Sequence, residues 1–147
     1  MRHVLLFNFL LTPYILMSQN DTVYFKNLND AERKIIVDKG TEPPYSGTYV
    51  DHFKKGTYCC KACGAELYNS THKFPSSCGW PSFDGEIKNA IKRKADISFG
   101  MTRTEILCAK CGGHLGHVFE GEQLTDKNVR HCVNSISLIF VHFDNAS

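Results

Sequence analysis

The sequence lacks an apolar run long enough to form a membrane-spanning helix. Its N-terminal apolar stretch, residues 4–17, is broken by Pro13, whereas a spanning helix needs about 20 apolar residues. Arg2 comes before this stretch and a small residue follows it, an order typical of a secretory signal peptide. We therefore predict a signal peptide over residues 1–18, a single domain over residues 19–147 and no stable membrane insertion.

The leader has two alternative interpretations, an uncleaved anchor and a segment without fixed structure. Cleavage would place the mature protein in the secretory pathway, outside the cell or in a periplasm. Without cleavage and export, the protein would be cytoplasmic. The order of charged, apolar and small residues favours cleavage.

The sequence also lacks a strong net charge. Its formal charge is +2 over 147 residues, and its basic run is Lys92–Lys94. Nucleic-acid-binding domains usually carry a concentrated basic patch, so we interpret this run as solvated surface and expect no nucleic-acid partner. The length leaves room for one domain with one hydrophobic core.

The sequence also lacks an even number of cysteines. The chain has seven, whereas a disulfide framework in a small secreted protein predicts an even number. Four of the seven form two Cys-x-x-Cys pairs, each followed by glycine. This spacing lets both sulfurs of a pair face one ion, and four thiolates make a closed structural zinc site. The predicted cofactor is one structural Zn²⁺ held by Cys60, Cys63, Cys108 and Cys111.

The zinc prediction has one alternative. The two pairs lie farther apart than the roughly 15–20 residues of a compact zinc ribbon. Thiol pairs in an oxidising compartment can also form disulfides, so a metal-free, disulfide-stapled secreted protein stays open. Cys59 has the wrong spacing to Cys63 for the ligand role, and we interpret it as a small buried residue.

Short apolar runs separated by glycines predict a mainly β domain. Asn29 or Asp30 can cap a helix over residues 31–38, which Gly40 would end. The predicted strands span residues 57–60, 97–99, 104–108, 115–119 and 135–143. We expect antiparallel sheets with one or two short N-terminal helices.

Two thiols outside the predicted zinc site are candidates for chemistry. Cys132 follows Arg130 and His131, and positive neighbours lower a thiol pKa, which favours the reactive thiolate. Cys78 lies in a segment of turn-forming residues, so we place it on a loop that can approach a second thiol. Trp80, the one tryptophan, is either an apolar wall beside this loop or a core residue.

Two histidines lie close together after the second cysteine pair. His114 and His117 would face opposite sides of a regular strand, so they reach one site only if Gly116 bends the chain. We keep both as candidates for the site and for ordinary core or surface positions. The other histidines of the predicted domain, residues 19–147, are interpreted as surface residues or as support behind the site: His52, His72, His131 and His142.

Several motifs together resemble one known family. They are Gly40–Pro44, the first cysteine pair, Cys78–Phe83, Gly100–Glu105, the second pair with His114–Phe119, and Arg130–Ser135. In this order they resemble the methionine-R-sulfoxide reductases of the B type. The resemblance covers about residues 40–140.

The resemblance implies a fold and an activity. The fold would be two antiparallel sheets in a zinc-stapled tent-like or barrel-like domain, with the nucleophile on a strand near the end. The activity would be reduction of methionine (R)-sulfoxide, protein-bound or free, to methionine. Cys132 would form a sulfenic acid and then a disulfide with the resolving thiol Cys78, which a thioredoxin-like reductant would recycle.

The resemblance also assigns the pocket. His114, His117 and Asn134 would bind the sulfoxide, and Trp80 would line the pocket for the methyl group. Three residues depart from the family pattern, and they bear on substrate preference and loop geometry: Pro75, Ser77 and His131. A zinc-supported β domain that only binds a partner is the competing function, but it gives no reason for the two remaining thiols.

Overall fold

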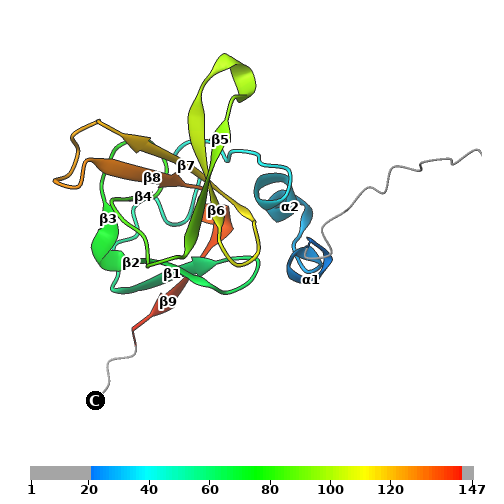
Figure 1. Ribbon diagram of the computed structural model, residues 1–147. Coiled ribbons are helices and arrows are strands. Elements are labelled where there is room, and N and C mark those ends of the chain that lie inside the picture. The colour runs from blue at the N-terminus through cyan, green and yellow to red at the C-terminus, as the bar shows by residue number, and fades with distance from the viewer. Residues whose placement is uncertain (1–20, 144–147) are drawn as a thin grey trace, which may run out of the picture.

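The computed structural model describes residues 21–143, so the predicted signal peptide lies outside the described residues. Within that range, no helix combines the length and the apolar character needed to cross a bilayer. Two antiparallel sheets form the body of the domain, and two short helices lie beside them (Figure 1). This confirms the predicted mainly β architecture.

The smaller sheet has the strand order β2-β1-β9. Its strands are β1 (Gly56–Cys60), β2 (Glu66–Asn69) and β9 (Leu138–His142). β1 lies in the centre and pairs antiparallel with both neighbours, with Cys60 opposite Leu138. The first and last strands of the domain are therefore joined, which closes the fold.

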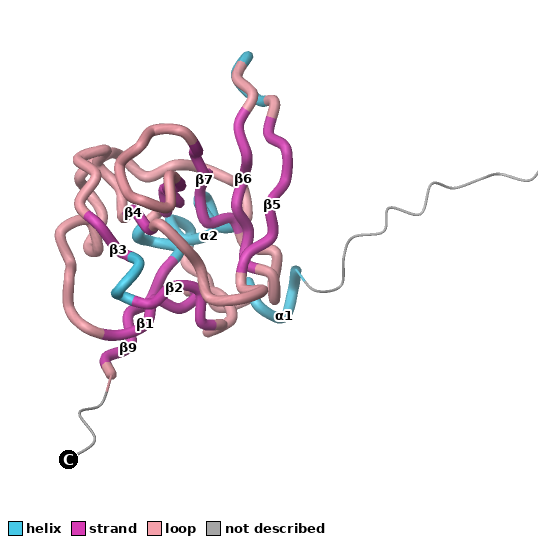
Figure 2. Tube along the Cα trace, turned by 60° about the vertical axis from the view of Figure 1, so that its left-hand side comes forward, coloured by secondary structure: helices cyan, strands magenta, loops and turns pink. Residues whose placement is uncertain are grey.

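The larger sheet has the strand order β3-β4-β8-β7-β6-β5. Its strands are β3 (Lys73–Phe74), β4 (Ser82–Phe83), β5 (Ile91–Asp96), β6 (Arg103–Cys108), β7 (His114–Glu120) and β8 (Val129–Val133). β5 and β6 continue into a hairpin that projects from the body of the domain (Figures 1 and 2). The described strands leave β3 and β5 as free edges, so the fold is tent-like and the larger sheet is no closed barrel.

Aromatic side chains join the two sheets. Tyr68 of β2 stacks on Phe83 of β4 with ring centroids 4.2 Å apart, and Tyr58 of β1 meets Phe83 edge-on at 5.1 Å. All three are fully buried. Such pairs contribute both buried area and favourable ring geometry, so this cluster fixes the angle at which the smaller sheet packs on the larger one.

The helices are α1 (Asp21–Phe25) and α2 (Asp30–Ile36). Asn29 caps α2 in a capping box with Glu32, in which each side chain binds the other residue's backbone amide. The helix therefore begins as predicted, with Asn29 as the cap, and ends two residues earlier than predicted. Ile36 is buried against Gly113, beside the second cysteine pair.

The predicted strands agree with the structure at three places and differ at two. Strands over 57–60, 104–108 and 115–119 are confirmed to within a residue at either end. The predicted strand 135–143 begins as a short 3₁₀ helix, η3 (Ser135–Ser137), before β9. The predicted strand 97–99 is wrong, because positive φ angles at Phe99 and Gly100 turn the chain there.

Candidate active site and metal centre

A small pocket of about 130 Å³ opens where β7 and β8 meet the loop before β4. Its lining includes Trp80, His117, Phe119, Cys132, Val133 and Asn134. The structure thus brings together four of the predicted site residues, Trp80, His117, Cys132 and Asn134, from three separate stretches of sequence. The lining is mostly apolar, as a pocket for a methyl thioether group requires.

Cys132 lies on strand β8, which sets its position. Sequence analysis did not predict this strand. In the register of the sheet, Cys132 stands opposite Ser82 on β4 and His117 on β7. Gly116 permits this close packing, since an added Cβ would lie 1.9 Å from the backbone oxygen of Cys132. The partly buried thiol is therefore held at the pocket by strands on both sides.

Cys78 reaches the same place from the loop before β4. Its sulfur lies 4.0 Å from the sulfur of Cys132, and the hydroxyls of Ser76 and Ser82 lie 3.0 and 3.4 Å from it. The thiol is half-buried and lies on a loop, as predicted. A short movement would bring the two sulfurs to disulfide distance.

The two thiols titrate as a pair. The contact with Cys132, together with hydrogen bonds from Ser76 and Ser82, lowers the pKa of Cys78 to about 4, against the opposing effect of burial. The same contact and then burial raise the pKa of Cys132, which Arg130 only partly opposes. The contact therefore lets the pair share one proton, so that one thiolate is present beside the pocket.

The two basic neighbours of Cys132 in the sequence have different roles. Arg130 lies on the same side of β8, above the ring of Phe119, and its guanidinium binds the carboxylate of Glu122 at 2.7 and 2.9 Å. His131 points the other way and is completely buried. Its effect on the thiol is therefore not the lowering of pKa that the sequence suggested.

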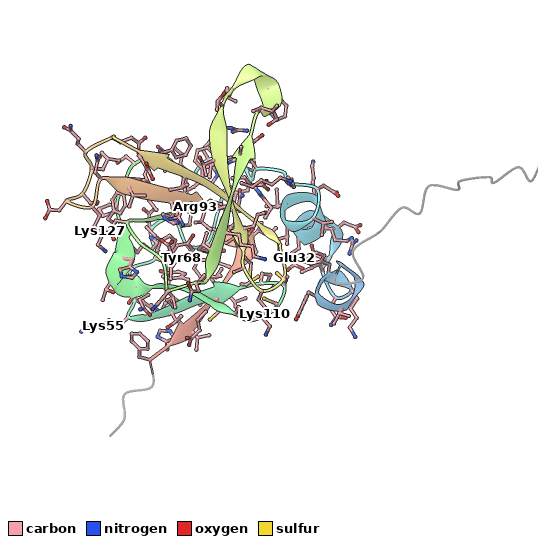
Figure 3. The ribbon with its side chains drawn as sticks, in the orientation of Figure 1. Glu32, Lys55, Tyr68, Arg93, Lys110 and Lys127 are labelled. Atoms are coloured by element: carbon pink, nitrogen blue, oxygen red, sulfur yellow. The ribbon has the colours of Figure 1, made fainter. Side chains whose placement is uncertain are left out.

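His131 instead supports the sheet from behind. Its ring nitrogens lie 3.1 Å from the hydroxyl of Tyr68 and 3.3 Å from the guanidinium of Arg93. Tyr68 and Arg93 are labelled at the centre of the domain in Figure 3. Burial is the main cause that lowers the pKa of His131 to about 4, so the imidazole is neutral at pH 7.

The two candidate histidines lie together but face different spaces. Their rings meet edge-on with centroids 5.6 Å apart. His117 lines both the Cys132 pocket and a larger groove beside it, whereas His114 lines the groove alone. His114 is buried, its Nδ1 lies 2.8 Å from Glu105, and its Nε2 has no hydrogen-bond partner among the described residues. Burial lowers the pKa of His114.

Two carboxylates that sequence analysis did not single out hold these histidines. Glu105 is buried and bridges His114 and the amine of Lys39, at 2.8 and 2.9 Å. Asp96 lies 2.7 Å from Nε2 of His117 and 2.9 Å from the guanidinium of Arg103. Glu105 stands in one of the recognised motifs, but nothing in the sequence linked Asp96 to His117.

Glu42 is a third residue that sequence analysis did not assign to the site. Its carboxylate accepts hydrogen bonds from the backbone amides of Ser135 and Ile136. Its own amide donates to the side-chain oxygen of Asn134 at 3.0 Å, and its carbonyl accepts from the indole of Trp80 at 3.0 Å. Glu42 therefore connects two walls of the pocket that are distant in sequence.

The four cysteines of the two pairs form one cluster. Their sulfurs all lie within 4.8 Å of one another, with 3.6 Å between Cys60 and Cys111 and between Cys63 and Cys108. A tetrahedron of sulfurs at about 2.3 Å from zinc has edges of about 3.8 Å. The cluster therefore has the size of a Cys₄ zinc site.

The two pairs use the same local geometry. The amide of Gly64 donates to the carbonyl of Cys60, and the amide of Gly112 donates to the carbonyl of Cys108, at 2.8 and 2.9 Å. Both glycines have positive φ, as this turn requires. One pair follows β1 and the other joins β6 to β7, so an ion here would fasten the smaller sheet to the larger one.

Electrostatics favours a cation at this cluster. Hydrogen bonds from Cys111 and Cys60 lower the pKa of Cys108 to about 2, and the contact with Cys108 raises the pKa of Cys111 to about 12. Sulfurs this close cannot all ionise unless a positive ion offsets their repulsion. The donor set therefore fits Zn²⁺, which binds four thiolates.

Comparison with known proteins agrees with this geometry. Residues 28–142 match the profile of the SelR domain. The chain is 47% identical to "Peptide methionine sulfoxide reductase MsrB" of Teredinibacter turnerae over 131 residues, which cover 88% of this chain and 96% of that one. It is 45% identical to the protein of that name from Leptospira interrogans, over 84% of this chain and 95% of that one.

Two further comparisons add to this picture. The chain is 52% identical to "Peptide methionine sulfoxide reductase B2, chloroplastic" of Arabidopsis thaliana, over 77% of this chain and 55% of that longer one. Among solved structures, the Mis18 "Yippee-like" domain superposes with a TM-score of 0.51 at 16% identity, over 63% of this chain and all of that one. The latter likeness is one of fold alone.

Proposed function

This chain belongs to the SelR family, the MsrB type of methionine-R-sulfoxide reductase, and on that premise we propose that Cys132 and Cys78 carry the reaction. The observation behind this assignment is the 4.0 Å contact between their sulfurs beside an apolar pocket that Trp80 lines. The chain is thus an oxidoreductase that acts on methionine sulfoxide, and the proposal concerns how its residues do so.

The first step makes Cys132 reactive. When the substrate enters, the proton that the pair shares moves to Cys78 and leaves Cys132 as the thiolate. The Cys132 thiolate then attacks the sulfoxide sulfur, and the oxygen passes to Cys132 as methionine leaves. The products are methionine and a Cys132 sulfenic acid.

The pocket binds the sulfoxide group. His117, held by Asp96, or a water bound to it supplies a proton to the sulfoxide oxygen. Asn134 is fixed by Glu42 and by its own amide bond to the carbonyl of Leu115 at 3.1 Å. His114 steadies the ring of His117, and Trp80 contacts the methyl group.

The second step resolves the oxidised cysteine. The Cys78 thiol condenses with the Cys132 sulfenic acid, which releases water and forms a disulfide. A dithiol reductant then takes up the oxidising equivalents by thiol–disulfide exchange and restores both thiols. Thioredoxin, at about −270 mV, is poised for this exchange.

Zinc has a supporting role in this proposal. The four clustered cysteines would hold one Zn²⁺ as a closed site, which supplies folding energy and offers no position to substrate. The reactive thiols lie outside this set. The proposal therefore predicts that peroxide removes two thiols from the reactive pair while zinc stays bound.

Export of the protein is a separate proposal that rests on the leader sequence alone. We expect signal peptidase to remove residues 1–18 and to leave the remaining chain in the secretory pathway or beyond. N-terminal sequencing of the protein isolated from its own cells tests this proposal. A mature N-terminus at Met1 would contradict it.

The decisive experiment compares Cys132→Ser with Cys59→Ala in reduction of a peptide containing methionine (R)-sulfoxide, with dithiothreitol as reductant. Cys59 is a buried cysteine outside both clusters, so its substitution controls for loss of a thiol. We expect no measurable turnover by Cys132→Ser, zinc content equal to that of the parent, and near-parental turnover by Cys59→Ala. Residual turnover by Cys132→Ser would remove Cys132 from the reaction.

A further inference from the structure

A groove adjoins the Cys132 pocket and is much larger than it. Its volume is about 570 Å³, compared with about 130 Å³ for the pocket. Thr41, Arg103 and His117 line both spaces and so form the border between them. One sulfoxide side chain suffices for the small pocket, and the rest of a larger substrate can continue into the groove.

The groove runs out along the β5–β6 hairpin to an apolar tip. Figures 1 and 2 show this hairpin projecting from the domain. At the tip the exposed fractions are 79% for Ile97 and 89% for Phe99, and both residues line the groove. Large apolar side chains grouped at an exposed projection are typical of a binding surface.

Phe99, at the tip, has a backbone conformation that is unfavourable for a bulky residue. Phe99 and Gly100 have φ angles of 54° and 69°, and the amide of Met101 closes the turn on the carbonyl of Ser98 at 3.1 Å. Turns with two positive φ angles favour Asn-Gly or Asp-Gly, and bulky residues avoid this conformation. The chain therefore keeps an exposed phenylalanine where folding alone would favour asparagine.

The tip is also fastened to the active site. The carboxylate of Asp96 accepts from the amide of Ser98 at 2.9 Å, at the base of the turn. The same carboxylate binds Arg103 and His117. The apolar tip and the pocket histidine thus share one anchor, which holds them at a fixed separation.

We propose that this groove and tip bind the polypeptide that flanks the oxidised methionine of a protein substrate, with an apolar substrate side chain against Phe99 and Ile97. The proposal rests on the proposed function and deepens it. Phe99 lies three residues beyond Asp96, which contacts the pocket residue His117, so the chain between Asp96 and Phe99 reaches at most about 10 Å. In an extended substrate, the side chain that contacts the tip therefore belongs to a residue three or four positions away from the sulfoxide.

The position of the groove distinguishes the substrate from the reductant. A reductant must reach the Cys78–Cys132 disulfide, and Cys78 lies on the loop of residues 76–80. Among the described residues, none of that loop lines the groove, which instead meets the pocket at Arg103 and His117. The groove is thus on the substrate's side of the site.

The test uses Phe99→Asn, which removes the aromatic ring and suits the turn. Its matched control is Phe143→Asn, the same substitution at another exposed phenylalanine, 53% exposed at the end of β9. Three substrates are compared with dithiothreitol as reductant: N-acetyl methionine sulfoxide amide, and two ten-residue peptides. One peptide carries leucine, and the other serine, at the third and fourth positions on each side of the sulfoxide.

We expect the parent protein and Phe143→Asn to favour the leucine peptide over the serine peptide by about tenfold in kcat/KM, as burial of an apolar side chain predicts. Phe99→Asn should lose this preference while its turnover of the amide stays unchanged. An intact preference in Phe99→Asn would overturn the proposal, as would an equal fall on all three substrates. The variants are also assayed with thioredoxin as reductant, and a defect of Phe99→Asn seen only in that assay would overturn the proposal and assign the tip to the reductant.

The amide substrate separates this proposal from the proposed function. If the parent protein reduces none of the three sulfoxides, the proposed function fails. If it reduces all three with equal kcat/KM, the function stands and the groove proposal fails.

Discussion

The protein contains two cysteine clusters of similar dimensions and very different surroundings. In the predicted metal centre, the closest sulfurs are 3.6 Å apart, and each pair is set by a rigid glycine turn. In the reactive pair, the sulfurs are 4.0 Å apart, and one of them lies on a loop beside a pocket. Sulfur proximity is thus common to both clusters, and the backbone and the adjoining space distinguish them.

The difference between the two clusters shows how cysteine can serve as a metal ligand in one place and as a reactive group in another. Four sulfurs around one point satisfy a tetrahedral cation and leave no open position. Two sulfurs share one proton, keep one thiolate and leave space for a third reactant. We therefore expect changes to the first cluster to affect folding, and changes to the second to affect turnover.

The largest effect is expected for Cys60→Ser. It would remove one ligand from a site whose metal binding is worth about 10–16 kcal/mol in small zinc peptides, comparable with the whole stability of a domain. We expect loss of zinc and of cooperative thermal unfolding, measured by metal analysis and circular dichroism. Cys132→Ser is the control and should keep both. An unchanged melting curve for Cys60→Ser would show that the first cluster does not support folding.

Cys78→Ser sharpens the comparison within the reactive pair. It should keep turnover with dithiothreitol within about threefold, since that reductant can reduce the sulfenic acid directly. With thioredoxin as reductant, its turnover should fall by about 100-fold or more, because thioredoxin acts on a disulfide. Steady-state rates with the two reductants measure the ratio. Equal activity with both would remove Cys78 from the catalytic cycle.

Glu42→Gln tests how precisely the pocket must be held. In the variant, the NH2 group of the glutamine side chain would face one of the two backbone N–H groups that now donate to the Glu42 carboxylate. Two donors facing each other repel, and the resulting shift of residue 42 would displace both Asn134 and Trp80. Misplacement of about 1 Å can cost roughly 100-fold in rate, and we expect a fall in kcat/KM of about 10- to 100-fold with zinc retained. Glu66→Gln, at an exposed position on β2, is the matched control.

For Glu42→Gln, the split between kcat and KM adds a second measurement. Loss of position should lower kcat, whereas loss of overall stability would lower the fraction of active protein without altering either constant per active site. A parental kcat/KM would show that Glu42 does not position the pocket.

The smallest effect is expected from the buried histidine behind Cys132. The pKa of His131 is about 4 in the folded state, compared with about 6.5 when unfolded. The unfolded chain therefore binds the proton more readily, so stability is full above about pH 6.5 and declines as the pH falls toward 4. At pH 5 the loss is about 2 kcal/mol.

His131→Phe should remove this acid sensitivity. Urea unfolding at pH 7 and pH 5 gives the difference in free energy of unfolding, which should shrink by about 2 kcal/mol in the variant. The exposed His142→Phe serves as the control and should leave the difference unchanged. An unaltered pH dependence in His131→Phe would show that other groups cause the acid sensitivity of this region.

Local patterns in the sequence determined the features that depend on neighbouring residues. Spacing and following glycines identified the four clustered cysteines, because each turn is set within five residues. Capping chemistry limited the N-cap of α2 to Asn29 or Asp30, and the structure shows Asn29. Strands β1, β6 and β7 followed from short apolar runs, whereas β5 was missed because its residues are mostly charged and exposed.

The tertiary structure alone decided which distant residues meet. Cys78 and Cys132 are 54 positions apart, and only the register of β8 between β4 and β7 brings their sulfurs together. The partners Glu42, Asp96 and Glu105 act through contacts that no local pattern encodes. Sequence therefore fixed which groups could do chemistry, and strand pairing fixed where they do it, because pairing depends on packing across the whole domain.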